Sequence, residues 1–324
     1  MAIDPIVVSY SELDTYRQCP LKHQLAYLQR WTKPLEASDR RSRGTLWHQV
    51  MEDHYEYLKD MWSTRVDSSQ ADLGHIQALR DLAIARHLSN PEPTGEQDEN
   101  QELVQWMYEG YLDNYGLDTK WIPLLTEQKF EVPLPDAFNR ASRYHLKMRI
   151  DLVVFDLTTG ALWVVDHKSG QNLPDQMSLE LDDQFGLYTW GLRELQRRGE
   201  LDTLLGRYNA FPILGSIHNA VRTQRNMGDR PGGKGKAQTM EQRMRRTYLN
   251  RSDVELDSIA HDAYAAAYNA HPPKSRTRPL YSSPDPRQCS WKCDFKEIHL
   301  AARTGVDVSR ALTDFGFVQD FTRH

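Results

Sequence analysis

The chain has 324 residues, a net charge of −5 and three cysteines, and its apolar and charged fractions are those of an ordinary soluble protein. No stretch approaches the roughly 18 apolar residues of a membrane span, and residues 1–14 lack the pattern of a secretory signal, so we expect a cytosolic protein without a membrane partner. The odd cysteine count excludes a disulfide framework, and the negative net charge excludes global attraction to nucleic acid, which would need a local basic surface.

The first third of the chain is predicted to be helical. Ser9 suits the N-cap of a helix over residues 9–19, Glu12 stands where it would close a capping box, and Pro20 ends or restarts the helix. The polar residues 89–101 indicate an exposed linker. Apolar residues at helical spacing predict further helices over residues 21–31, 44–62, 72–88 and 102–115.

The pattern changes at residue 122, where short or alternating apolar runs indicate strands. A turn at residues 158–160 joins two of them into a hairpin, and Gly199 follows the end of a predicted helix. The strands are predicted over residues 124–134, 144–157, 161–169 and 206–214, and helices over residues 179–199 and 255–270.

The stretch "VVDHKSG" places an acid, a base and a glycine at the end of an apolar strand. Because side chains two apart share one face of a strand, Asp166 and Lys168 point the same way and His167 points to the other side. Pairing across the hairpin brings Asp151 toward Asp166, and two adjacent carboxylates favour a hard divalent cation. The alternative is a plain ion pair between Asp166 and Lys168 at a strand end.

Four motifs, taken in order, resemble a known family. They are "GTLWHQVME" with His48, "RIDLVV" with Asp151, "VVDHKSG" with Asp166 and Lys168, and "DDQFGLY" with Gln184 and Tyr188. In this order they resemble the RecB-like branch of the PD-(D/E)xK nuclease superfamily, which includes the iron-sulfur exonucleases of CRISPR adaptation and related phage exonucleases. The resemblance covers most of the chain and implies an α/β fold with a mixed central sheet flanked by helices.

The resemblance also implies a metal site and its chemistry. Mg²⁺ or Mn²⁺ would be held by His48, by two carboxylates and by the backbone carbonyl of His167, and would activate water and polarise the phosphate. The two carboxylates are Asp151 and Asp166. Lys168 would orient or deprotonate that water and offset the growing negative charge.

Supporting residues have both a functional and an ordinary interpretation. Gln184 could bridge to phosphate or to the catalytic acid and Tyr188 could offer its ring to a base, whereas the ordinary interpretation is a polar helix face. His48 alone would be read as an ordinary helix histidine. Glu52 lies one turn after His48 and suits a structural acid, and Glu127 could approach the metal from a neighbouring strand.

The cysteines resemble the iron-sulfur ligands of the same family. Cys19 lies near the N-terminus, Cys289 and Cys293 lie near the C-terminus, and the position where the family has a fourth cysteine is occupied by His299. Three cysteines and a histidine can hold a [4Fe-4S] cluster or a tetrahedral Zn²⁺. The alternative is three buried free thiols and no metal.

Residues 221–251 are basic and rich in glycine, which predicts a mobile insertion. In a chain of negative net charge such a segment suits phosphate contacts along single-stranded DNA, and the alternative is a solvated loop. The candidate DNA-binding residues are Arg222, Arg225, Arg230, Lys234, Lys236, Arg243, Arg245 and Arg246.

We therefore expect a DNA exonuclease of recombination, repair or phage DNA metabolism, acting on single strands or DNA ends in a bacterial or phage-infected cell. A catalytically inactive DNA-end-binding or assembly module on the same fold is the main alternative, and a restriction enzyme is another. Because no P-loop is present, unwinding would need a helicase or recombination partner. The expected divisions are a helical region over 1–118, the nuclease core over 119–215, the basic insertion and a helix over 216–280, and a C-terminal metal-cluster knot and tail over 281–324.

Overall fold

The computed structural model describes residues 4–34, 40–63, 95–230, 232–272 and 293–321, with single positions at 78, 82, 282, 283, 285, 287, 289 and 290. The chain forms two compact units. The first contains residues 1–36, 133–147 and 260–324, and the second contains residues 37–132 and 148–259. The helix expected over residues 72–88 lies, except for Ala78 and Leu82, outside the described residues.

A mixed sheet runs through the described part of the chain in the order β1-β4-β5-β6-β7, with β3 paired to β4. The β1–β4 and β5–β6 pairs are parallel, and the β4–β5 and β6–β7 pairs are antiparallel. The predicted mixed sheet flanked by helices is confirmed. The strands are β1 (Ile6–Ser9), β3 (Trp121–Pro135), β4 (Ala141–Asp156), β5 (Ala161–Gly170), β6 (Ile213–Arg222) and β7 (Met244–Asn250).

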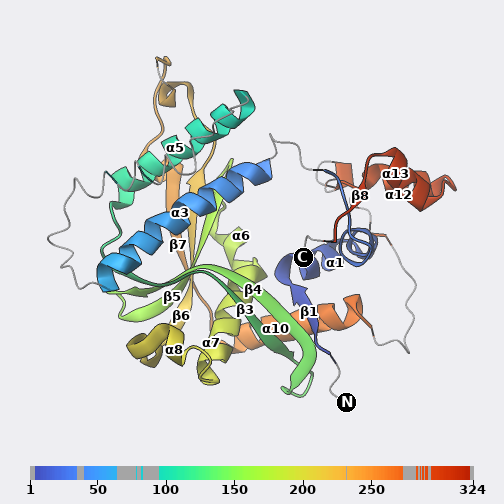
Figure 1. Ribbon diagram of the computed structural model, residues 1–324, viewed down its shortest axis with the longest axis horizontal. Coiled ribbons are helices and arrows are strands. Elements are labelled where there is room, and N and C mark those ends of the chain that lie inside the picture. Colours follow the sequence, from blue (N-terminus) through green and yellow to red (C-terminus); the bar gives the residue numbers. More distant parts are fainter. Residues whose placement is uncertain are drawn as a thin grey trace. The chain divides into compact units, whose positions relative to one another are not determined.

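In the second unit, helices α3 (Arg40–Ser63) and α5 (Gly95–Tyr115) lie side by side over one face of β5, β6 and β7 (Figure 1). Their apolar side chains, such as Trp47 and Met107, form one core with Val165 and Ile217 of the strands. Because α5 begins at Gly95, the predicted linker over residues 89–101 is wrong for its second half.

Helix α7 (Asp183–Arg197) packs on the opposite face of β6, where the Thr189 hydroxyl bonds the Ser216 hydroxyl at 2.6 Å. The single helix predicted over residues 179–199 is interrupted, because α6 (Gln176–Glu180) ends before Asp182 caps α7. Gly199 follows the end of α7 with a φ of +72°, as predicted. Further helices are α8 (Asp202–Leu205), α9 (Met240–Arg243) and α10 (Asp253–Ala270).

In the first unit, Ser9 caps α1 (Tyr10–Gln18) by accepting the Glu12 N–H, and Pro20 starts α2 (Pro20–His23), as predicted. The Glu12 carboxylate does not close a capping box, because two histidines engage it. A small core, including Leu25 and Phe317, is built with the C-terminal helices. The remaining elements are the π-helical turn Gln24–Leu28, β2 (Trp31–Thr32), α12 (Lys296–Arg303), α13 (Val308–Asp314) and β8 (Val318–Gln319).

Two predictions about residues 206–251 are wrong. The strand predicted over residues 206–214 begins only at Ile213, because Gly206–Ala210 form a 3₁₀ helix. The mobile insertion predicted over residues 221–251 contains Met244–Asn250, which form β7 and pair with β6. Gly215 permits this pairing, because a Cβ there would collide with the Leu249 carbonyl. No helix among the described residues is long and apolar enough to cross a membrane.

Candidate active site

Strand β5 presents Asp166 and Lys168 on the same face, and the structure brings their charged groups together. The Lys168 ammonium lies 3.0 Å from Asp166 Oδ1 and 2.9 Å from Oδ2. Burial lowers the pKa of Lys168, but the charges of Asp166 and Asp151 outweigh it and raise that pKa well above its usual value. Lys168 is therefore a fixed ammonium in the metal-free site.

Asp151 lies beside Asp166 because Leu152 of β4 pairs with Val165 of β5. Its Oδ2 accepts the backbone N–H of His167 at 2.8 Å. Burial and the neighbouring Asp166 charge raise the pKa of Asp151 to about 7, against the opposing effect of His48 and Lys168. The positive charges of His48 and Lys168 therefore do not fully compensate the two neighbouring carboxylates.

His48 reaches the same place from α3. Its Nδ1 lies 3.3 Å from Asp151 Oδ2 and 3.8 Å from Glu127 Oε1. Burial lowers the pKa of His48, but the bond to Glu127 and the charge of Asp151 raise it overall. Glu127 adopts a φ of +48° within β3, a strained conformation that suits a functional position. One ligand atom each from His48, Glu127 and Asp151 lies within 4.8 Å of the others.

The donor set fits a hard divalent cation. Asp166 Oδ2 is buried and, apart from the Lys168 ammonium, accepts no hydrogen bond within the described part of the chain. Carboxylate oxygens with one imidazole are ligands that Mg²⁺ and Mn²⁺ accept. Glu52 lies nearby, and burial together with the Glu127 charge raises its pKa.

Gln184 and Tyr188 on α7 belong to the surroundings of this site. Burial and the Asp166 charge raise the pKa of Tyr188 to about 12, while its hydrogen bond with Gln184 opposes that shift. The two side chains are half-buried. The tyrosine therefore stays neutral and offers an uncharged ring beside the carboxylates.

His167 turns to the opposite face of β5, as the strand period predicts. Its ring stacks on Tyr55 at 5.4 Å, and its Nδ1 accepts from Asn219 Nδ2 at 2.9 Å. Burial lowers the pKa of His167 well below its usual value. The imidazole is therefore a neutral packing group, and the residue reaches the site through its backbone.

The structure places the predicted cysteine ligands around one cavity of about 270 Å³ in the first unit. Cys19, Cys289, Cys293 and His299 all line it, and the three thiols are free. Among the described residues, these ligand atoms do not gather within 4.8 Å of one another as the His48 group does. A tetrahedral zinc site with bonds of about 2.3 Å would need such closeness.

The basic candidates divide into three groups by the exposure and the partners of their side chains, and Arg243 and Arg246 make up the third. Exposed side chains are Arg230, Lys234, Lys236 and Arg245. Arg222 and Arg225 are half-buried, with Arg225 paired to Glu102 at 2.7 Å.

Arg243 and Arg246, also predicted as DNA contacts, form the third group, because their guanidinium groups bond inside the protein. Arg243 is buried and donates to the Trp106 carbonyl at 2.9 Å. Arg246 pairs with buried Asp118 at 2.6 Å. The Arg243 guanidinium lies on the Trp106 ring, and that of Arg246 lies against Tyr115 and Trp121.

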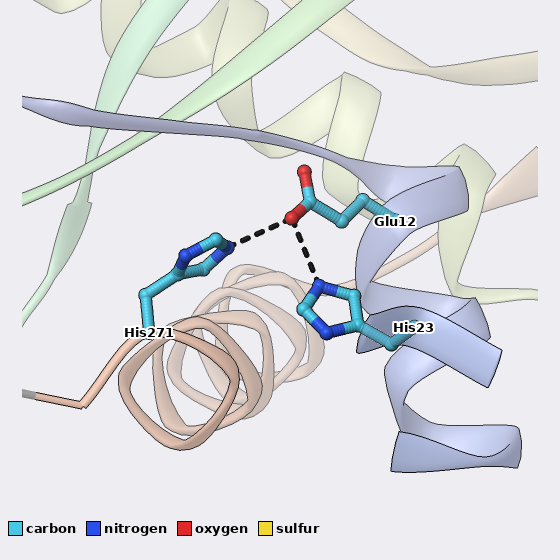
Figure 2. A group of neighbouring side chains, drawn as sticks. All are labelled: Glu12, His23 and His271. Atoms are coloured by element: carbon cyan, nitrogen blue, oxygen red, sulfur yellow. Dashed lines mark hydrogen bonds and ion pairs between the residues drawn. The ribbon is translucent and has the colours of Figure 1, made fainter. Parts of the chain in front are cut away.

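Sequence reasoning missed a second histidine–carboxylate cluster in the first unit. Glu12 Oε1 bonds His23 Nε2 at 3.0 Å and His271 Nε2 at 2.8 Å, so both rings point at one oxygen (Figure 2). His271 is 259 positions from Glu12, and no local motif signals that separation.

The model of the PD-(D/E)XK nuclease superfamily matches residues 7–298. No curated protein matches the chain.

Proposed function

The chain belongs to the PD-(D/E)XK nuclease superfamily, and on this premise we propose that it is a metal-dependent DNA exonuclease of the RecB-like branch. The observation that carries the proposal is the pair Asp151 and Asp166, buried side by side with one Asp166 oxygen short of hydrogen bonds. His48 and Lys168 adjoin them. This arrangement supports phosphodiester hydrolysis more than a DNA-binding module that has lost its site.

His48, Glu127, Asp151 and Asp166 would hold Mg²⁺ or Mn²⁺. When bound, the ion lowers the pKa of water and polarises the scissile phosphate. Lys168 keeps its proton on Nζ, so it orients the attacking water and offsets charge on the phosphate rather than acting as the base. Gln184 contacts the substrate phosphate, and the Tyr188 ring supports a base.

The exposed basic residues supply phosphate contacts along single-stranded DNA or at DNA ends. Replacing Arg230, Lys234 and Lys236 by alanine should weaken DNA binding and flatten its salt dependence. Each phosphate contact that is lost reduces the number of counterions released when DNA binds. Turnover on saturating DNA should change much less. An unchanged salt slope would remove this segment from the DNA interface.

The cavity lined by Cys19, Cys289, Cys293 and His299 suits a [4Fe-4S] cluster better than a single zinc ion, because the ligand atoms stand apart around it. The cluster would tie the N-terminal segment to the C-terminal segment of the first unit, and its binding energy would be folding energy. Anaerobically purified protein should be brown, with about four irons per chain. Colourless protein with about one zinc would favour zinc, and metal-free protein with three titratable thiols would exclude both.

Incubation with end-labelled single-stranded and double-stranded DNA, with Mg²⁺, Mn²⁺ or EDTA, tests the proposal. An exonuclease gives metal-dependent release of short products from an end, and a closed circular single strand should resist it. Metal-dependent cutting of the circle would establish an endonuclease instead. Metal-independent binding without cleavage would favour the assembly module, whose partner would be a helicase or recombination protein.

A further inference from the structure

Arg246 and Asp118 form a buried ion pair in the second unit. The guanidinium donates from Nη1 to Asp118 Oδ1 at 2.7 Å and from Nη2 to Oδ2 at 2.6 Å, and the side chains are 13 % and 5 % exposed. The guanidinium lies 3.6 Å from the ring centroid of Tyr115 and 4.1 Å from that of Trp121. Two parallel bonds and two rings fix this pair in one geometry.

One branch of hydrogen bonds leads from the pair to α3. Asp118 Oδ2 accepts the hydroxyls of Tyr55 at 2.7 Å and Tyr111 at 2.8 Å. Tyr55 belongs to α3, two helical turns after His48. The charged pair is therefore connected directly to the helix that carries the site histidine.

A second branch leads to the catalytic strand. Arg246 Nε donates to Asn219 Oδ1 at 3.3 Å, and Asn219 Nδ2 donates to His167 Nδ1 at 2.9 Å. His167 stands between Asp166 and Lys168 on β5 and turns its ring away from them. The Tyr55 ring stacks on the His167 ring, so the two branches meet behind the catalytic strand.

We propose that Arg246 and Asp118 are positioning residues of the nuclease site, which set the place of α3 relative to β5. This proposal rests on the proposed function. A buried ion pair contributes little net stability compared with apolar groups of the same volume, so stability alone does not account for it. Directional bonds to both elements fix their relative position more tightly than apolar contacts, which tolerate sliding.

Replacing both charges by apolar groups separates positioning from stability. The double variant Asp118→Leu with Arg246→Met fills the space without leaving an unpaired charge, and such replacements are often neutral or stabilising. We expect a folded protein with a lower thermal unfolding midpoint, because Asn219 Oδ1 and one of the hydroxyls of Tyr55 and Tyr111 lose their partners. Mn²⁺ affinity measured without DNA, and kcat, should each fall at least tenfold, whereas KM should change less.

Two further variants keep the test decisive if the double variant folds poorly. Tyr55→Phe removes one hydroxyl and keeps the ring on His167, and should weaken Mn²⁺ binding several-fold. Arg243→Met is the matched control, because Arg243 is also buried and stacked on an aromatic ring but bonds the Trp106 carbonyl. It should lower stability and leave Mn²⁺ affinity unchanged.

A stably folded double variant or Tyr55→Phe protein with wild-type Mn²⁺ affinity and kcat would overturn the positioning role and leave Arg246 structural. Equal loss of Mn²⁺ affinity in Arg243→Met would overturn it as well, since the effect would then follow destabilisation in general. A wild-type chain that neither binds Mn²⁺ nor cleaves DNA would overturn the proposed function, and this inference with it.

Discussion

Among the described residues, each unit holds one cluster of histidine and carboxylate side chains, and the pKa of a carboxyl group is raised in one cluster and lowered in the other. In the second unit, Asp151 faces another carboxylate as well as His48, and burial with the Asp166 charge raises its pKa to about 7. One oxygen of Asp166 stays short of hydrogen bonds. That cluster has an excess of buried negative charge.

The cluster in the first unit is closed by its own hydrogen bonds. Burial raises the pKa of Glu12, but the bonds from His23 and His271 outweigh burial and lower it to about 2 (Figure 2). Similar residue types within 4.8 Å therefore have opposite needs for a cation. Whether a cluster needs a cation depends on the charges and hydrogen bonds that face its carboxylate. The number of possible ligand atoms does not determine it.

The largest expected difference between the two clusters is the effect of removing one carboxylate on the rate of DNA cleavage. Asp166→Ala should lower the cleavage rate by several orders of magnitude while the fold survives, because it deletes a charged ligand and little apolar packing. Lys168→Ala should also lower kcat strongly, because the fixed ammonium is lost. Glu12→Gln, which removes the carboxylate charge of the other cluster, should cleave DNA at the wild-type rate once folded. Undiminished cleavage by Asp166→Ala protein would reject the assigned site.

Strand period and motif order predicted much of the candidate active site. Asp166 and Lys168 share one face because side chains alternate along β5, and Asp151 adjoins Asp166 because the hairpin register follows from a short turn. Both relations are between residues close in the chain, so they can be predicted from the sequence. The superfamily match covers the same motifs.

Relations between distant segments could not be read in the same way. The basic composition around Arg246 predicted an exposed loop, but pairing with β6 buries this arginine against Asp118, 128 positions away. The contact of His271 with Glu12 likewise depends on tertiary packing. Charge patterning describes the average of a segment, and it cannot tell which side chain faces the core.

Glu12→Gln tests whether the first-unit cluster is closed. Glutamine keeps one acceptor oxygen but loses the charge that two imidazole N–H groups address, so we expect destabilisation of about 1 to 3 kcal/mol by denaturant unfolding. Zn²⁺ should not change the stability of the wild type through this cluster. The matched variant Glu127→Gln should instead weaken Mn²⁺ binding, and it also removes the ion pair of Glu127 with Arg149. Zinc stabilisation of the wild type that Glu12→Gln abolishes would make the cluster a metal site.

The two pKa shifts predict opposite pH responses. The folded-state pKa of Asp151 is above its ordinary value of 3.8, so its stabilising contribution is complete below about pH 4 and is lost as pH rises through about 7. The folded-state pKa of Glu12 is below its ordinary value of 4.5, so its contribution is present above that value and is lost as pH falls through about 2. Of these two carboxylates, only Asp151 responds between about pH 5 and 7.

In EDTA, the contribution of Asp151 to stability should therefore fall as pH rises from 5 to about 7, by at most about 1.4 kcal/mol per unit. Buried His54, His167 and His218 have lowered pKa values and add a contribution of opposite sign, so the effect of Asp151 is measured as the difference between the pH profiles of the wild type and Asp151→Asn. Glu12→Gln should leave this difference unchanged. Because the metal competes with the Asp151 proton, Mg²⁺ affinity should rise up to about tenfold per unit over the same range and level off above it. Calorimetric titrations of Mg²⁺ at several pH values measure the effect. A pH-independent affinity would mean that Asp151 is already ionised in the metal-free protein, and the contrast between the two clusters would then fail.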